Sequence, residues 1–244
     1  MFKVGINCQK GKRDYMEDRV LLFGNKDIHI SAVFDGHGGS KTSTFLINNF
    51  IKLFRDTLVK TKTPKIKFIL LMTMDKLSNI LLKNKIADGS TANIMVIYKN
   101  NYHIANTGDS RMFVAYKNGS VKQITKDHKI CAYEKRQIKS RGGFIQNGRV
   151  DGILALARAF GDYGISKHIT HKPDYYTGSI KDIDFFIQGS DGLFDCATNY
   201  ELYKKAKPLM KKGVDLNSVG KELVTYTIKN KKSMDNVSII ITKP

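Results

Sequence analysis

Acidic side chains in this sequence stand beside small residues at the ends of apolar segments. One Asp-Gly pair is foremost a turn signal, as Asp88-Gly89 and Asp151-Gly152 illustrate. Repetition of the pattern at many segment ends is harder to explain by turns alone. If the apolar segments are strands stacked in register, these carboxylates converge on one rim and require compensating cations. The positions concerned are Glu17-Asp18, Asp35-Gly36, Asp109-Ser110, Asp191-Gly192 and Asp235-Asn236.

A bound metal is the natural source of that positive charge. Oxygen-only ligand sets suit a hard divalent cation, Mg²⁺ or Mn²⁺, whereas zinc prefers histidine or cysteine. The six histidines show no His-Glu-x-x-His spacing that would favour zinc. The three cysteines are scattered without a Cys-x-x-Cys pair, so we expect neither a disulfide framework nor a thiolate zinc site.

Composition indicates one globular unit. The 244 residues are 41% hydrophobic and contain no internal repeat or linker-like tract, so we expect a single domain over residues 1–244. The longest strongly apolar run, Phe68–Met72, is far too short to span a membrane, and no apolar block follows Lys3. We therefore expect a soluble intracellular protein, cytoplasmic or nuclear, that is a monomer and does not bind membranes.

The formal net charge of +19 is the unusual bulk property. A field of that sign attracts nucleic acid, acidic lipid surfaces or anionic substrates. The basic residues are dispersed, however, and lack the aromatic interleaving of single-strand binders. We favour solvated lysine-rich faces, and a nucleic-acid-associated protein remains an alternative.

Hydrophobic periodicity predicts an α+β fold with antiparallel sheet. We expect strands over residues 2–8, 19–23, 28–34, 91–98, 102–106, 112–116, 121–125, 185–187 and 237–241. The four strands between residues 91 and 125 have the pattern of one antiparallel meander. We expect helices over residues 45–58 with Ser40 as cap, 64–82 starting at Pro64, 133–140, 199–206 ending before Pro208, and 216–226 capped by Asp215.

Eight segments in a fixed order resemble the metal-dependent protein phosphatases, the type 2C serine/threonine phosphatases. Any one of them is a weak signal, but together they cover nearly the whole chain. They are Lys12–Asp18 (KRDYMED), Val33–Gly39 (VFDGHGG), Gly89–Ala92 (GSTA), Asn106–Arg111 (NTGDSR), Asp127–Lys129 (DHK), Gly148–Asp162 (ending ARAFGD), Ser190–Asp195 (SDGLFD) and Asp235–Ile241 (DNVSIII).

The resemblance implies a four-layer α-β-β-α sandwich, two antiparallel sheets flanked by helices, with two Mg²⁺ or Mn²⁺ ions at one end. By position in the matching segments, Asp35 would bridge the two ions, and Asp191 and Asp235 would hold one of them. Glu17 and the Gly36 carbonyl would serve the other ion, and Asp18 would orient metal-bound water. Asp109, with Asp191, would hold a third and weaker ion.

The resemblance also implies a reaction, hydrolysis of phosphoserine and phosphothreonine in proteins. Hydroxide activated by the two metals would attack the phosphomonoester directly, without a covalent phospho-enzyme. Arg13 would grip the substrate phosphate through its guanidinium fork, and His37 would protonate the departing oxygen. The basic charge of the chain would favour acidic phosphoproteins.

Plainer interpretations accompany these assignments. His37 could cap a loop carbonyl, Arg13 could form an exposed salt bridge, and Asp18 could cap a turn. Asp162 and Asp195 lie inside matching segments but are interpreted as structural. A pseudophosphatase that only binds partners is a further alternative, although the intact ligands Glu17, Asp35, Asp191 and Asp235 count against it. The chain is also shortened between Asp109 and Asp191, near the flap that selects substrates in this family.

Overall fold

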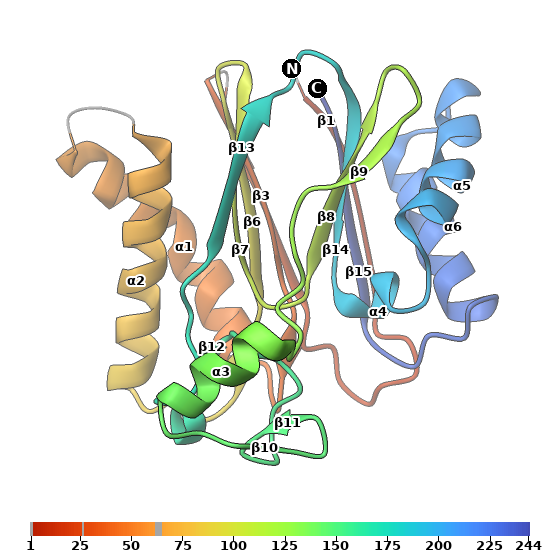
Figure 1. The fold of residues 1–244 in the computed structure, drawn as a ribbon. Coiled ribbons are helices and arrows are strands. Elements are labelled where there is room, and N and C mark those ends of the chain that lie inside the picture. The colour runs from red at the N-terminus through yellow and green to blue at the C-terminus, as the bar shows by residue number, and fades with distance from the viewer. Residues whose placement is uncertain (1, 26, 62–64) are drawn as a thin grey trace.

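Two five-stranded antiparallel sheets face each other in the centre of the structure (Figure 1). This computed structural model describes residues 2–25, 27–61 and 65–244. The first sheet has the spatial order β1 (Lys3–Gln9), β15 (Val237–Lys243), β14 (Ile183–Gly189), β8 (Arg111–Tyr116) and β9 (Val121–Gln123). The second has the order β13 (Asp174–Ser179), β7 (Asn101–Thr107), β6 (Ala92–Tyr98), β3 (Ile28–Phe34) and β2 (Arg19–Gly24).

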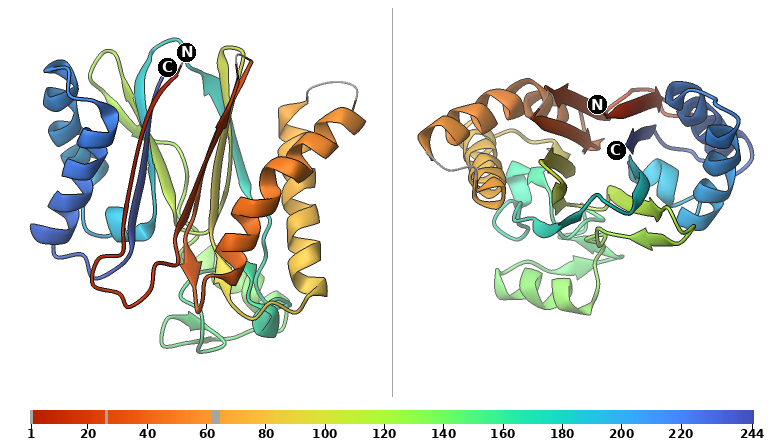
Figure 2. Two further views of the ribbon diagram at one scale, coloured as in Figure 1. Left: turned by 180° about the vertical axis from the view of Figure 1, so that it is seen from behind. Right: turned by 90° about the horizontal axis from the view of Figure 1, so that it is seen from above.

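Helices cover the outer face of each sheet (Figure 2). α1 (Lys41–Lys60) and α2 (Ile66–Lys83) pack on the second sheet, and α5 (Asn199–Lys211) and α6 (Leu216–Lys229) pack on the first. The short helix α4 (Asp191–Phe194) follows β14 directly. The predicted four-layer α-β-β-α sandwich is therefore confirmed. Among the described residues, no helix is both long and apolar enough to cross a membrane.

The space between the sheets is filled by apolar side chains. Met95, Met112, Val114 and Phe186 are all buried there, where the alternation of each strand directs one set of side chains inward. The other faces of the same strands are buried beneath the helices, as Phe113 and Phe185 are on the first sheet. Strands buried on both faces leave little polar alternation in the sequence.

The predicted meander between residues 91 and 125 is wrong. β6 and β7 form one hairpin in the second sheet, whereas β8 and β9 form another in the first. The chain crosses from one sheet to the other between Thr107 and Arg111, with Gly108 at a positive φ of 98°. Apolar alternation predicts where strands lie in the sequence but not which sheet each strand joins. The crossing places Asp109 between the two sheets.

Two helix boundaries differ from expectation. Ser40 occupies the cap position of α1 but makes no side-chain cap bond. The carboxylate of Asp88 caps this helix instead, accepting from Lys41 N at 2.7 Å and Thr42 N at 3.1 Å. The expected start of the next helix at Pro64 lies outside the described residues, and α2 begins at Ile66.

The C-terminal helices show one correction and one confirmation. α5 was expected to end before Pro208, but it continues through this residue to Lys211. Its start is strongly fixed by a capping box between Thr198 and Glu201. Asp215 caps α6 as predicted, accepting from the backbone of Asn217 and Ser218.

A segment between β9 and β13 lies across one end of the sandwich, at the bottom of Figure 1. This segment, called the flap below, contains α3 (Ala132–Ser140), β10 (Ile145–Gln146), β11 (Arg149–Val150), β12 (Phe160–Gly161) and the 3-10 turn Tyr163–Ile165. Arg158 ties it together, since its guanidinium contacts Glu134 of α3 at 2.7 Å and Asp174 of β13 at 2.9 Å. Its strand β12 joins β5 (Gly89–Ser90) and β4 (Gly36–His37) in a small sheet.

Candidate metal centre and active site

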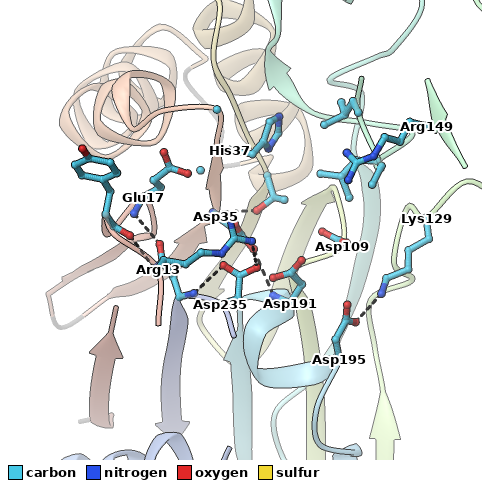
Figure 3. Close-up of a pocket in the computed structure, with 18 of the residues that line it drawn as sticks. Arg13, Glu17, Asp35, His37, Asp109, Lys129, Arg149, Asp191, Asp195 and Asp235 are labelled. Carbon is cyan, nitrogen blue, oxygen red and sulfur yellow. Dashed lines mark hydrogen bonds and ion pairs between the residues drawn. The ribbon is translucent and has the colours of Figure 1, made fainter. Parts of the chain in front are cut away.

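The predicted acidic residues meet in one pocket at the flap end of the sandwich (Figure 3). Each stands where a strand of the central sheets begins or ends. Asp35 follows β3, Asp191 follows β14, and Asp109 lies between β7 and β8. Glu17 and Asp235 precede β2 and β15 and line the same pocket.

Three of these carboxylates form the centre of the cluster. Asp35, Asp109 and Asp191 each offer an oxygen, and the three oxygens lie within 4.8 Å of one another. The backbone holds this arrangement. Asp35 N donates to Thr91 Oγ1 at 3.0 Å, and Asp191 N contacts Asp35 Oδ2 at 3.4 Å. Segments more than 150 residues apart are thereby fixed against each other around one point.

The proton affinities of the cluster reflect carboxylates crowded together away from water. Burial, followed by the charge of Asp191, raises the pKa of Asp109 to about 7. Burial and then the neighbouring charges of Asp18 and Asp191 raise the pKa of Asp35 well above its usual range. Burial and the charge of Asp235 raise the pKa of Asp191 as well. Such a site strongly favours the arrival of positive charge.

Asp18 does not line the pocket, but its charge contributes to the raised pKa of Asp35. Its side chain is buried, and its Oδ2 atom has no hydrogen-bond partner among the described residues. Burial raises the pKa of this carboxyl to about 6. A buried oxygen without a partner costs free energy unless water or a cation satisfies it. The position therefore suits a group that orients metal-bound water.

Gly36, the predicted carbonyl ligand, lines the pocket in β4. A Cβ atom at this position would lie 2.6 Å from Glu17 O and 2.9 Å from Ser43 Oγ. Ser43 Oγ donates to the same Glu17 carbonyl at 2.6 Å. Glycine is thus required here because the Glu17 backbone packs directly against it.

Arg13 enters the pocket from the N-terminal segment and binds a predicted metal ligand. Its Nη2 atom lies 2.7 Å from Asp235 Oδ2, and the arginine side chain is 57% exposed. The hydrogen bond to Asp235 raises the pKa of Arg13 further above its usual value. Asn236 secures the segment, since its Oδ1 accepts from Glu17 N at 2.8 Å and its Nδ2 donates to Tyr15 O at 2.9 Å.

His37 also lines the pocket, and its partner is Asp162. His37 Nε2 lies 2.8 Å from Asp162 Oδ2 and 3.1 Å from Asp162 Oδ1. Burial alone would lower the pKa of His37, but the hydrogen bond and charge of Asp162 outweigh burial and raise it. The histidine is therefore not the carbonyl-capping loop residue of the plainer interpretation.

Sequence reasoning missed several residues of this pocket. Asp195, interpreted as structural, lines it and pairs with Lys129, whose Nζ lies 2.5 Å from Asp195 Oδ1. Arg149 of the flap lines it too, and Figure 3 shows Arg149 and Lys129 across the view from Glu17 and Arg13. The available signal was the placement of Asp195 in the same matching segment as Asp191. No spacing pattern in the sequence predicted that Arg149 of the flap would line this pocket.

The donor set fits a hard divalent cation. All its side-chain members are carboxylates, and three of them converge within coordination range. Burial and the neighbouring carboxylates raise the pKa values of Asp35 and Asp109, and a cation bound among them would offset that repulsion. Asp35, Asp191, Asp235, Glu17 and the Gly36 carbonyl would hold the metal, and Asp109, which lies close to Asp35 and Asp191, would be a further ligand. Among the described residues, this carboxylate group contains no histidine or cysteine ligand.

Comparisons with known proteins identify relatives over nearly the whole chain. The family model described as "Protein phosphatase 2C" matches residues 2–237. A relative from Oryza sativa subsp. japonica, "Probable protein phosphatase 2C 62", is 32% identical over 99% of this chain and 86% of its own length. "Probable protein phosphatase 2C 11" from Arabidopsis thaliana is 32% identical over 99% of this chain, which spans 66% of that relative.

Solved structures show the same fold. The "Structure of a C.elegans sex determining protein" has a TM-score of 0.90 at 26% identity and covers 99% of this chain and 64% of that one. The "serine-threonine phosphatase 2C from Toxoplasma gondii" has a TM-score of 0.86 at 20% identity and covers 99% of this chain and 94% of that one. The family model over residues 2–237 and the relative of 32% identity show that the chain belongs to the protein phosphatase 2C family.

Proposed function

We propose that this protein is a Mg²⁺- or Mn²⁺-dependent protein-serine/threonine phosphatase. The observation that carries the proposal is the convergence of Asp35, Asp109 and Asp191 within 4.8 Å. The metals, when bound, would supply a hydroxide that attacks the phosphomonoester directly, so that no covalent phospho-enzyme forms. The named relatives are protein phosphatases, which supports phosphorylated proteins as substrates.

Three side chains would bind the phosphate, donate a proton and orient the water. Arg13, which contacts Asp235 of the pocket, has a guanidinium fork whose geometry matches two phosphate oxygens and would bind the substrate phosphate. His37 lies beside the pocket and would donate a proton to the departing seryl or threonyl oxygen. Asp18, which is buried, would orient the water on the metals.

The charge of the whole chain, formally +19, supports a preference for acidic substrates. Arg149 lines the pocket, and so do Arg13 and Lys129, which are paired with Asp235 and Asp195. Positive potential at the entrance of a site raises the rate of encounter with anions. We propose that phosphopeptides with acidic neighbours are hydrolysed faster than neutral ones at low ionic strength.

The central test is metal-dependent hydrolysis of p-nitrophenyl phosphate. The wild-type protein should be active with Mn²⁺ or Mg²⁺ and lose that activity with a chelator. Asp35→Asn should reduce kcat by at least about a hundredfold, because it removes charge from the centre of the cluster. Asp56→Asn, a change at an exposed aspartate of α1, is the matched control and should leave kcat unchanged.

Two outcomes would contradict the proposal. Near-normal turnover by Asp35→Asn would show that the carboxylate cluster is not the catalytic centre. A folded wild-type protein that takes up no divalent cation in titration calorimetry would favour a partner-binding role for the same fold.

A further inference from the structure

The contact between His37 and Asp162 is built by three separate segments. The two residues are 125 positions apart in the sequence, yet both oxygen atoms of the Asp162 carboxylate lie within 3.1 Å of His37 Nε2. The small sheet brings them together, because His37 in β4 pairs with Gly89 in β5 and Gly161 in β12 pairs with the same glycine. The pair therefore sits on a backbone platform and not on a free loop.

Asp162 is held in an unusual conformation. Its φ is 48° and its ψ is 47°, in the left-handed region that residues with a Cβ seldom adopt. Its N–H donates to Asp88 O at 3.0 Å, and its carbonyl accepts from Ile165 N at 2.9 Å. The side chain is buried and directed at the imidazole. Strain of this kind persists where the surrounding structure over-determines it.

The second nitrogen of the ring is left available. A carboxylate accepts hydrogen bonds, so Nε2 must carry a proton to bind Asp162. Among the described residues, none forms a hydrogen bond with His37 Nδ1, and the residue lines the pocket that contains the carboxylate cluster. In a Ser-His-Asp triad, likewise, the aspartate binds one imidazole nitrogen and the other nitrogen transfers the proton.

We propose that Asp162 is a positioning residue that fixes the His37 ring through Nε2–H and thereby assigns proton delivery to Nδ1. This inference rests on the phosphatase function proposed above. In the step concerned, the P–O bond to serine or threonine breaks as the oxygen of a hydroxide ion bonds to phosphorus. The electron pair of the broken bond goes to the departing oxygen, which takes the proton from Nδ1. The ring is left neutral with its Nε2–H still on Asp162, and it recovers a proton from solvent.

The leaving group provides the test. A departing seryl oxygen is strongly basic and needs a proton, whereas p-nitrophenolate leaves readily without one. We expect Asp162→Asn to reduce kcat for a phosphoserine peptide about tenfold to a hundredfold more than kcat for p-nitrophenyl phosphate. Asparagine tolerates the left-handed conformation, so the backbone should keep its course. His37→Gln should show the same selective loss, and the double variant should lose no more than His37→Gln alone.

The matched control is Asp75→Asn. His171 Nε2 lies 2.8 Å from Asp75 Oδ1, so this variant also weakens an aspartate–histidine pair, but on α2 and away from the pocket. It should leave the ratio of the two kcat values unchanged. Equal losses on both substrates by Asp162→Asn, or additive losses in the double variant, would overturn the proposal and assign Asp162 to structure alone.

A measurement without turnover covers the case in which Asp162→Asn does not fold. Side-chain ¹⁵N NMR of the wild-type protein, with His37 assigned by His37→Gln, should show a proton on Nε2 at a pH where the ring is neutral. A neutral ring protonated on Nδ1 would refute the assignment. Failure of the phosphatase function itself has another signature, the lack of chelator-sensitive hydrolysis of either substrate by the wild-type protein.

Discussion

Arg13 Nη2 lies 2.7 Å from Asp235 Oδ2, so the predicted phosphate-binding group and a predicted metal ligand are paired with each other. The arginine is the cation that partly neutralises this side of the cluster. A metal that takes Asp235 as ligand competes with the guanidinium for the same carboxylate. If Arg13 binds the substrate phosphate and Asp235 binds a metal, as proposed, the two binding events are coupled through the Asp235 side chain.

The first prediction concerns Arg13→Ala. Loss of a charged hydrogen-bonding fork should reduce kcat/KM for a phosphoserine peptide about tenfold to a hundredfold, equivalent to roughly 1.5–3 kcal/mol. Divalent-cation binding should become tighter, because the competitor for Asp235 is gone. Steady-state kinetics at saturating metal and titration calorimetry measure the two effects.

Arg13→Lys keeps the charge without the fork and should recover only part of the kcat/KM loss. A variant with unchanged peptide kinetics would exclude phosphate contact by Arg13.

The second prediction concerns protons and metal uptake. The folded-state pKa values of Asp18 and Asp109 are raised to about 6 and about 7, while unfolded aspartates titrate near 3.9. A carboxyl with a raised folded pKa binds more protons in the folded state, so the metal-free protein should lose stability as pH rises from about 4 to 7. A bound cation reverses this penalty. The rise in Tm caused by Mn²⁺ should therefore be larger at pH 7.5 than at pH 5.5.

Calorimetry provides the direct check of this proton linkage. Metal binding at pH 6 should release protons, seen as a dependence of the observed heat on the ionisation enthalpy of the buffer. The dependence should shrink at pH 8, where the carboxyls are already ionised. Buffer-independent heats at both pH values would contradict the raised pKa values of the cluster.

The sequence predicts much of the fold because local signals and tertiary packing agree. The strand ending at Phe34 and the cap of Asp215 follow from alternation and from capping chemistry. The sheet membership of β7 and β8 could not be predicted, because both are buried on both faces and pairing is a non-local property. The cap of α1 by Asp88 could not be predicted either, because Asp88 lies 47 positions from Lys41 and the contact is non-local.

In the site, too, some residues could be predicted from local sequence signals, whereas others depend on non-local packing. Asp35, Asp109 and Asp191 could be selected from the sequence because their position after or between strands directs them to one sheet end. Asp162 could not, because its role depends on the small sheet that carries His37 to it from 125 positions away. Arg149 reaches the pocket only because the flap lies over it, and no periodicity encodes that placement.

The third prediction concerns Pro208 inside α5. Proline lacks an N–H, so the carbonyl four residues earlier loses its helical partner, and the ring crowds that turn. Pro208→Ala should raise the free energy of unfolding by about 1–2 kcal/mol, the helix gain being reduced by the extra entropy of the unfolded chain. Thermal denaturation should show a Tm higher by about 2–8 °C. The kcat should stay unchanged because Pro208 does not line the metal pocket. A lower Tm would show that the ring makes a packing contribution larger than the missing hydrogen bond.

The fourth prediction tests the small sheet that holds His37 against Asp162. A Cβ on Gly89 would lie 2.1 Å from both His37 Nε2 and Asp162 Oδ2, so alanine cannot occupy this position while the pair remains in contact. Gly89→Ala should lower stability by about 1–3 kcal/mol through this overpacking. It should also reduce turnover of a phosphoserine peptide more than that of p-nitrophenyl phosphate, because it separates the two side chains without changing either. Gly164→Ala is the matched control, since a Cβ there would meet no atom of the described residues within 4 Å beyond its chain neighbours and the backbone of its own turn. Thermal denaturation and the two kcat values decide the outcome, and a Gly89→Ala variant with the wild-type ratio would mean that the backbone yields and preserves the contact.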